Sequence, residues 1–245
     1  MSFDALFGPV EDLDAWLTGL FDGAPLLVAL GIALVLGVRH ASDPDHLVAV
    51  TSLVAAEGGE TRHATRLGLW WGLGHAAILI LVGVPLIALK SELPGWLERG
   101  AETAVGLVIL LLALRVVVKW ARGHYRAGPH GHHDHSHRHL RRGDRAHAHA
   151  TLRSPRQAVG IGVLHGLAGT GAVVVLLIAA LPGRLEAAAA LTLFAPMTVL
   201  SMALCTTVFA WVLTRPLLEP LYRSVLIPAL GAFGLMFGLW YSGLT

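Results

Sequence analysis

A run of ionisable side chains lies between two apolar stretches near the beginning of the chain. Residues 39–46 read Arg-His-Ala-Ser-Asp-Pro-Asp-His, with mostly apolar residues at 25–38 before them and 47–56 after them. At the centre of a membrane helix an arginine or aspartate costs about 2.5–3.5 kcal/mol, and such residues mark ion or substrate paths. The run therefore predicts a membrane protein in which this segment lines such a path.

Pro44 predicts that the first membrane helix is broken inside this run. Proline lacks an N–H group and disfavours helical dihedral angles at the residue before it, which is Asp43. We expect the break at Ser42–Pro44, with Asp43 capping a new helix that has Pro44 at its first position. Broken helices near the bilayer midplane recur at the binding sites of transporters.

The composition agrees with a membrane protein. Of 245 residues, 55% are hydrophobic and 14% are charged, whereas a soluble domain carries about 25% charged residues. The formal net charge is only +2, so we expect the lipid bilayer, and not a nucleic acid, as the partner surface. Cys205 is the only cysteine, which excludes an intrachain disulfide and a zinc site built from several cysteines.

Six apolar segments have about the 20-residue length that a membrane helix needs. We expect an all-α polytopic protein with two three-helix halves, residues 25–121 and 156–245, joined by a disordered cytoplasmic His-rich loop at 122–155. Residues 1–24 alternate apolar and acidic side chains at helical spacing, which predicts an amphipathic helix lying in the membrane interface or packed on the rest of the protein. The predicted segments are 25–56 (broken at Ser42–Pro44), 67–89, 101–121, 156–181, 187–213 and 220–243.

Lysine and arginine are concentrated in alternate loops. The loops at 57–66, 122–156 and 214–223 hold two, eight and two of them, while the opposite side holds only Lys90, Arg99 and Arg184. The positive-inside rule places the basic loops in the cytoplasm. Both termini are therefore expected outside a bacterial-type inner membrane.

A weak internal repeat relates the two halves. Gly37-Val-Arg-His40 in the first half resembles Gly162-Val-Leu-His165 in the second. Because each half crosses the membrane three times, a repeat must be inverted, which is a common plan for transporters.

The candidate metal ligands are two histidines and two aspartates at the break: His40, Asp43, Asp45 and His46. Imidazole suits nickel, cobalt, copper and zinc, and a carboxylate adds neutralising charge. The spacing does not choose among these metals. The alternative interpretation is an internal network in which Arg39 pairs with one of the aspartates.

Two further histidines lie inside later apolar segments. His75 is flanked by Gly72 and Gly74, which would let the first helix approach, and His165 lies in a glycine-rich run. Each is either a packing residue or an additional metal ligand. Met202 and Cys205 share a helix face three residues apart, and core packing is the expected role of both.

A histidine-rich stretch lies between the two halves. Residues 124–149 contain nine histidines and no hydrophobic face to bury. Histidine-rich tracts bind transition metals loosely. Storage, delivery or sensing of metal is expected there, with a solvated basic loop as the alternative.

The motifs resemble a known family. Residues 39–46 resemble the His-x4-Asp-His signature of the nickel/cobalt permease superfamily, and Leu73-Gly-His75 resembles its second block. Residues 162–171 and 194–207 resemble the shorter branch related to urease-accessory-type nickel transporters. Longer members have eight membrane segments, and the acidic motif of their fourth segment is replaced here by His165-Gly-Leu-Ala-Gly-Thr.

The resemblance implies metal recognition by His40, Asp45, His46 and His75. We expect a secondary transporter, not an enzyme, that moves Ni²⁺ or Co²⁺ as its substrate and holds no cofactor. Asp43 and His75 would complete or orient the shell, and a cytoplasmic metallochaperone is an expected partner. Two alternatives stay open: a metal exporter using the same site, and an intramembrane metalloenzyme, against which the chain has no His-Glu-x-x-His motif.

Overall fold

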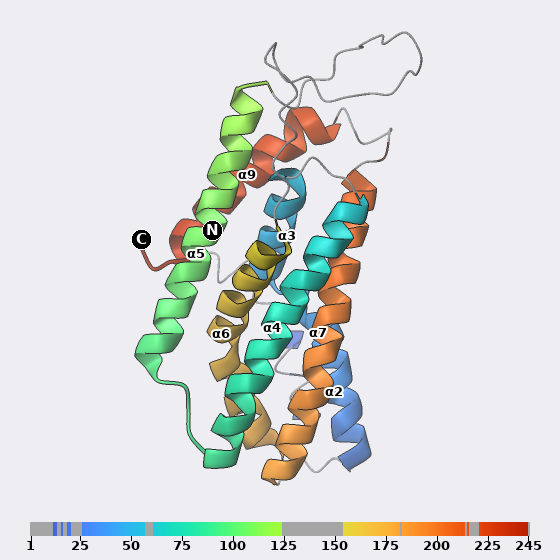
Figure 1. The fold of residues 1–245 in the computed structure, drawn as a ribbon, viewed down its shortest axis with the longest axis vertical. Coiled ribbons are helices and arrows are strands. Elements are labelled where there is room, and N and C mark those ends of the chain that lie inside the picture. The colour runs from blue at the N-terminus through green and yellow to red at the C-terminus, as the bar shows by residue number, and fades with distance from the viewer. Residues whose placement is uncertain are drawn as a thin grey trace.

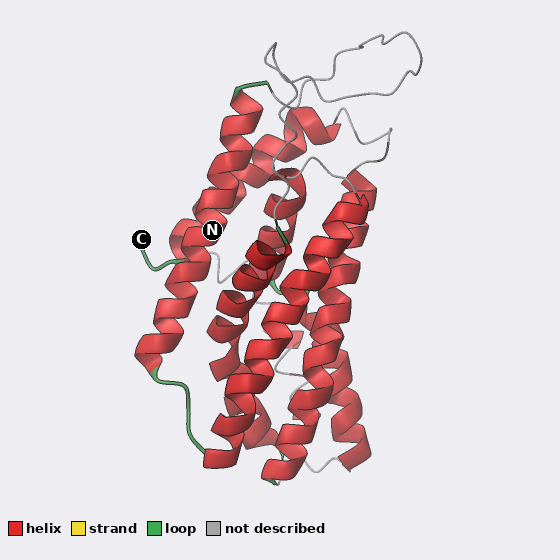
Figure 2. Cartoon of the chain, in the orientation of Figure 1, coloured by secondary structure: helices red, strands yellow, loops and turns green. Residues whose placement is uncertain are grey.

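The structure, a computed structural model, describes residues 12–13, 16, 19–20, 26–56, 61–123, 154–181, 183–213, 215 and 221–244. Within this part of the chain every regular element is helical and no strand occurs (Figure 2), which confirms the all-α prediction. The elements are α2 (Leu26–His40), α3 (Pro44–Ala56), α4 (Thr61–Leu89), α5 (Gly95–Ala121), α6 (Pro155–Ala180), α7 (Arg184–Leu213), the π-helical turn η1 (Tyr222–Leu226) and α9 (Ile227–Tyr241).

The first membrane segment is broken where the sequence predicts. α2 ends at His40 and α3 begins at Pro44, and the axes of the two pieces differ by 41°. Five other helical stretches are long and apolar enough to cross a bilayer, so counting the bent pair as one span gives six. Length and composition thus agree with the six predicted segments.

Several helices begin earlier than the apolar segments that predicted them. α4 begins at Thr61 instead of 67, and α5 begins at Gly95 instead of 101. The hydrophobic window marks only the part that suits the bilayer core, whereas helical hydrogen bonding continues through the polar first turns. Arg62 and Arg66 therefore lie on α4 and not in a loop.

The helices pack in pairs across the two halves (Figure 1). α4 packs along both α7 and α6, α2 packs along α7, and α5 packs along α9. Exchanging the first-half elements α2/α3, α4 and α5 for α6, α7 and α9 turns the α4–α6 pair into the α7–α2 pair and leaves the α4–α7 and α5–α9 pairs unchanged. The inverted repeat itself stays a prediction.

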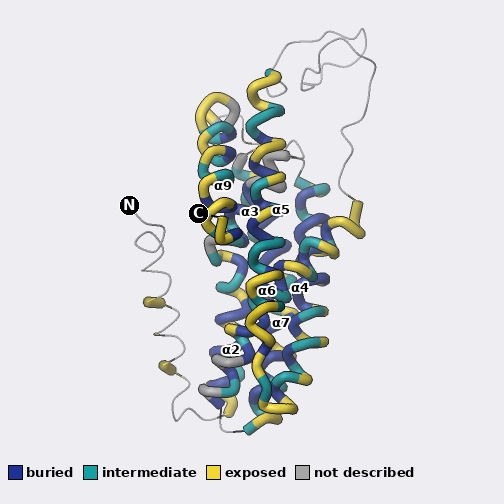
Figure 3. The backbone as a smooth tube through the Cα atoms, turned by 90° about the vertical axis from the view of Figure 1, so that its left-hand side faces the viewer, coloured by how far each residue is buried: buried dark blue, intermediate teal, exposed yellow. Residues whose placement is uncertain are grey.

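Two apolar cores lie at different levels of the bundle. Trp71 of α4 belongs to one core, and Leu79, two turns further along α4, belongs to the other. His75 lies between them on the same helix. Apolar side chains such as Leu81 and Leu111 are exposed, as expected for a surface in contact with lipid. Figure 3 shows exposed stretches along the helices of the bundle.

Close contact between α4 and α6 depends on glycine. A Cβ at Gly162 would lie 2.0 Å from the Trp71 carbonyl oxygen, and one at Gly74 would lie 2.3 Å from the Val159 carbonyl oxygen. Such close backbone approach is the role of small residues in membrane helix packing. It brings His75 and His165 to the same level.

Two predicted segments fall mainly on residues that the structure does not describe. Of residues 1–24, only 12–13, 16 and 19–20 are described, and the apolar side chains of Leu13, Trp16 and Leu20 among them are exposed. The His-rich stretch 124–149 lies wholly outside the described residues. The amphipathic and loop interpretations of these segments stay predictions.

Candidate metal centre

Four helices bring histidines to one place in the middle of the bundle. The broken helix supplies His40 from the end of α2 and His46 from the first turn of α3, while α4 and α6 each supply one histidine from their interior. His46 is central: its ring centroid lies 4.5 Å from that of His40, 5.3 Å from that of His75 and 4.2 Å from that of His165.

The centre of this cluster is closed to solvent. His46, His75 and His165 are exposed by 2%, 0% and 2%. Among the described residues, neither His46 Nε2 nor His75 Nδ1 has a hydrogen-bond partner, although both atoms are buried. Buried polar atoms are nearly always paired, so unpaired nitrogens inside a histidine cluster suit a ligand that carries positive charge.

Asp45 connects the break to α6. Its Oδ2 lies 2.8 Å from His165 Nε2, and its Oδ1 lies 3.1 Å from His46 Nδ1 and accepts the backbone N–H of His46 at 2.9 Å. Tyr241, at the end of α9, lies beside the same carboxylate. Side chains from three helices, α3, α6 and α9, therefore meet at the Asp45 carboxylate.

The contact between α2 and α4 is made by two imidazoles. His40 Nε2 lies 3.1 Å from His75 Nε2, and the two ring centroids are 5.0 Å apart. The other nitrogen of His40, Nδ1, lies 2.9 Å from Asp43 Oδ2. A carboxylate on one nitrogen fixes the imidazole tautomer and leaves the opposite nitrogen free to act as a ligand.

Asp43 has a different environment from Asp45. Its Oδ1 lies 2.9 Å from Arg39 Nη1, so the carboxylate is shared between an arginine and a histidine. This is the Arg39–aspartate network that the sequence left open. The same carboxylate thus faces both Arg39 and His40.

Aromatic side chains cover the cluster from two sides, and sequence reasoning missed both. Trp71 stacks on His46 with centroids 5.6 Å apart at 25°, and it also contacts His165. Phe194 of α7 contacts His40 at 5.4 Å between centroids. Trp71 precedes His75 by one helical turn, so helix periodicity was the signal that could have identified it.

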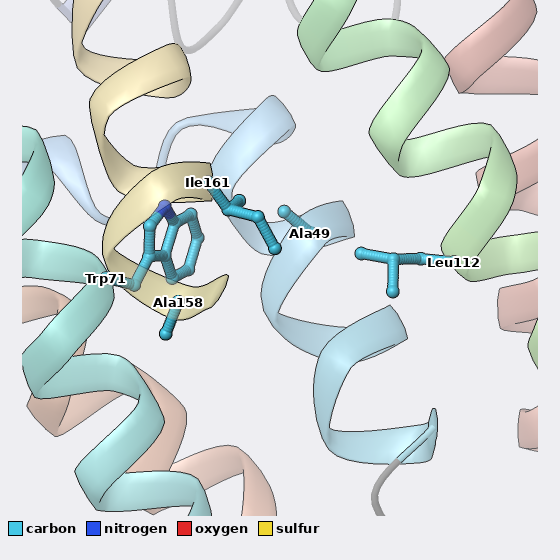
Figure 4. Close-up of a pocket in the computed structure, with 5 residues that line it drawn as sticks. All are labelled: Ala49, Trp71, Leu112, Ala158 and Ile161. Carbon is cyan, nitrogen blue, oxygen red and sulfur yellow. The ribbon is translucent and has the colours of Figure 1, made fainter. Parts of the chain in front are cut away.

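Trp71 also lines an apolar pocket. The pocket lies between α3, α4, α5 and α6, and Ala158 and Ile161 of α6 lie beside the indole (Figure 4). The lining residues are Ala49, Trp71, Leu112, Ala158 and Ile161.

The sulfur-containing residues of α7 belong to the packing. Met202 is fully buried in the apolar core, and Cys205 is half-buried against the same core. Both positions agree with the packing role expected from the sequence.

The fold and the site together define a multi-pass membrane protein with a nitrogen-rich ligand cluster between its helices. Residues 26–182 match the NicO family model, described as high-affinity nickel-transport protein, and the chain belongs to this family.

Individual relatives agree with the family. The chain is 26% identical over 220 residues to the urease accessory protein UreH of Bacillus sp. (strain TB-90), covering 90% of this chain and 92% of UreH. It is 35% identical over 105 residues to the high-affinity nickel transport protein of Cupriavidus necator, covering 42% of this chain and 29% of that protein. It is 30% identical over 86 residues to the cobalt transport protein NhlF of Rhodococcus rhodochrous, covering 34% of this chain and 24% of NhlF. The chain therefore spans nearly all of UreH but less than a third of the two transporters. No solved structure matches it.

Proposed function

We propose that this protein is a secondary permease that carries Ni²⁺, and also Co²⁺, into the cell through the histidine cluster. The observation that carries the proposal is the convergence of four histidines with Asp45 at the helix break. The histidines are His40, His46, His75 and His165, of which the last three are buried. Imidazole nitrogen and carboxylate oxygen are ligands that nickel and cobalt accept in tetragonal or octahedral geometry. Asp43 acts as the orienting partner of His40.

The proposed orientation follows from the loop charges. The basic stretch 122–156 lies in the cytoplasm of a bacterial-type inner membrane, and both termini lie outside. Ions entering from outside would then leave the cluster toward the side that carries the His-rich stretch 124–149. That stretch and a cytoplasmic metallochaperone are the proposed receivers of the ion.

The test is metal accumulation in cells, measured by elemental analysis with nickel and cobalt supplied separately. His40→Ala and His46→Ala should lose accumulation at normal expression. His63→Ala is the matched control, because it removes an imidazole from α4 at a distance of about 18 Å along the helix from His75. A higher metal content in cells with wild type or the control than in cells with His40→Ala or His46→Ala would support import.

Two other outcomes would change the assignment. Less metal in wild-type cells than in the variants would make the same cluster the site of an exporter, and deletion of residues 124–149 should then reduce metal tolerance. Equal metal in all strains would remove nickel and cobalt as substrates.

A further inference from the structure

The ligand atoms of the cluster fall into two groups of three. His40, His46 and His75 form one group, called here the imidazole triad; Asp45, His46 and His165 form the other, called here the carboxylate triad. Within each triad the ligand atoms lie within 4.8 Å of one another, and across the described residues only these two groups meet that spacing. His46 belongs to both.

Each triad has the spacing of ligands around one ion. Two ligands bound at about 2.0–2.1 Å, the range for metal–imidazole bonds, are about 2.9 Å apart when they meet at a right angle. The corresponding distances are 3.1 Å between His40 Nε2 and His75 Nε2, and 2.8 Å between His165 Nε2 and Asp45 Oδ2. One pair of ligand atoms in each triad therefore already lies at the spacing of two ligands on one ion.

His46 has one ring nitrogen for each of the two triads. Its Nδ1 lies 3.1 Å from Asp45 Oδ1, in the carboxylate triad. Its Nε2 is buried and has no hydrogen-bond partner among the described residues. The same imidazole can therefore serve either triad.

The two triads have different aromatic neighbours. Gly72 of α4 faces Val199 of α7, and Gly83 faces Leu191, so the two helices run antiparallel in this register. Phe194 then lies level with the part of α4 beyond His75, whereas Trp71 lies one turn before it. Phe194 contacts His40 of the imidazole triad, and Trp71 contacts His165 of the carboxylate triad and the shared His46.

We propose that the transported ion occupies these two triads in turn, with His46 as the ligand common to both, and that His40 and His75 are thereby exchanged for Asp45 and His165. This inference rests on the proposed function of the cluster. A divalent ion stripped of all ligands in a buried site is very unfavourable, and two triads that meet at one residue keep ligands within reach during the step. Several adjacent sites also let an ion enter with affinity and still leave.

The test uses the full-length protein in nanodiscs with Ni²⁺ alone as the probe. Equilibrium binding gives the number of ions, and X-ray absorption counts the imidazoles on the bound nickel. His75→Ala should bind one ion through the carboxylate triad, with two imidazoles, and His165→Ala should bind one ion through the imidazole triad, with three. Both should lose transport by about ten-fold or more, while His46→Ala should lose binding.

Several results would overturn the two-position model. It fails if His75→Ala or His165→Ala loses binding as completely as His46→Ala, if the two variants show the same imidazole count, or if either transports normally. Simultaneous binding of two ions by wild type would also contradict it. Thermal unfolding and the milder His75→Gln and His165→Gln variants separate loss of a ligand from misfolding. Failure of wild type to bind or accumulate nickel or cobalt would instead refute the proposed function.

Discussion

Gly162→Ala should damage both stability and transport, although Gly162 carries no side chain. Its added Cβ would lie 2.0 Å from the Trp71 carbonyl oxygen and 2.9 Å from the His75 backbone nitrogen. Real Cβ contacts essentially never fall under 3.0 Å, so α6 and α4 must separate by about 1 Å. The opposing atoms belong to the backbone, and no change of rotamer can relieve the contact.

The magnitude follows from that displacement. Overpacking of this kind costs about 1–3 kcal/mol, and for a protein of this size each kcal/mol lowers the unfolding temperature by about 2–4 °C. His165 lies one turn after Gly162 and moves with α6 away from His46 and Asp45. A misplacement of about 1 Å in a site that depends on orientation can reduce its rate by about 100-fold.

The assay combines thermal unfolding of purified protein with nickel accumulation at matched expression. Gly160→Ala is the control on the same helix, because its Cβ would meet nothing within 4 Å. That variant should transport normally and be about 0.5–1 kcal/mol more stable, since alanine favours the helix over glycine. Wild-type stability and accumulation in Gly162→Ala would refute the close approach of α4 and α6 at the cluster.

Three other substitutions test separate parts of the structure. Asp43→Asn removes the charge that faces His40 Nδ1, so nickel affinity measured by calorimetry should fall about 10–100-fold while the number of imidazoles on bound nickel stays the same; unchanged affinity would show that His40 needs no orienting partner. Trp71→Ala should lower the free energy of unfolding by about 3–5 kcal/mol, because the indole is buried in the core, and a loss under about 1 kcal/mol would contradict that packing. Gly171→Ala should change stability by no more than about 0.5 kcal/mol, because the group that its Cβ meets is the flexible carboxylate end of Glu98; a loss as large as that of Gly162→Ala would contradict this distinction.

Local sequence was sufficient for the helix break and for the class of protein. Hydrophobic length identified the membrane segments, and Pro44 fixed where α2 ends and α3 begins, because a missing N–H group acts on its own neighbours. The burial cost of ionisable groups singled out residues 39–46, with His40, Asp43, Asp45 and His46 as the candidate ligands. These inferences depend on physics that operates within a few residues or between a segment and its solvent.

Only the tertiary structure decided which side chains each of the six candidate ligands contacts. Asp43 and Asp45 are two residues apart, yet one contacts Arg39 and His40 and the other contacts His46 and His165. That difference arises from the turn at Pro44, which points successive side chains toward different helices. Spacing in the sequence could not reveal it.

Whether His75 and His165 lie in the histidine cluster also depended on the packing between helices. Each lies inside a long apolar helix, where a lone histidine is compatible with either packing or ligation. What brings them to His46 is the approach of α4 and α6, which depends on Gly74 and Gly162 lying against backbone of the other helix. The sequence by itself determined a membrane protein with a polar break and a set of candidate ligands. The tertiary structure decided which candidate ligands lie together, because distances between helices are set by contacts between residues far apart in the chain.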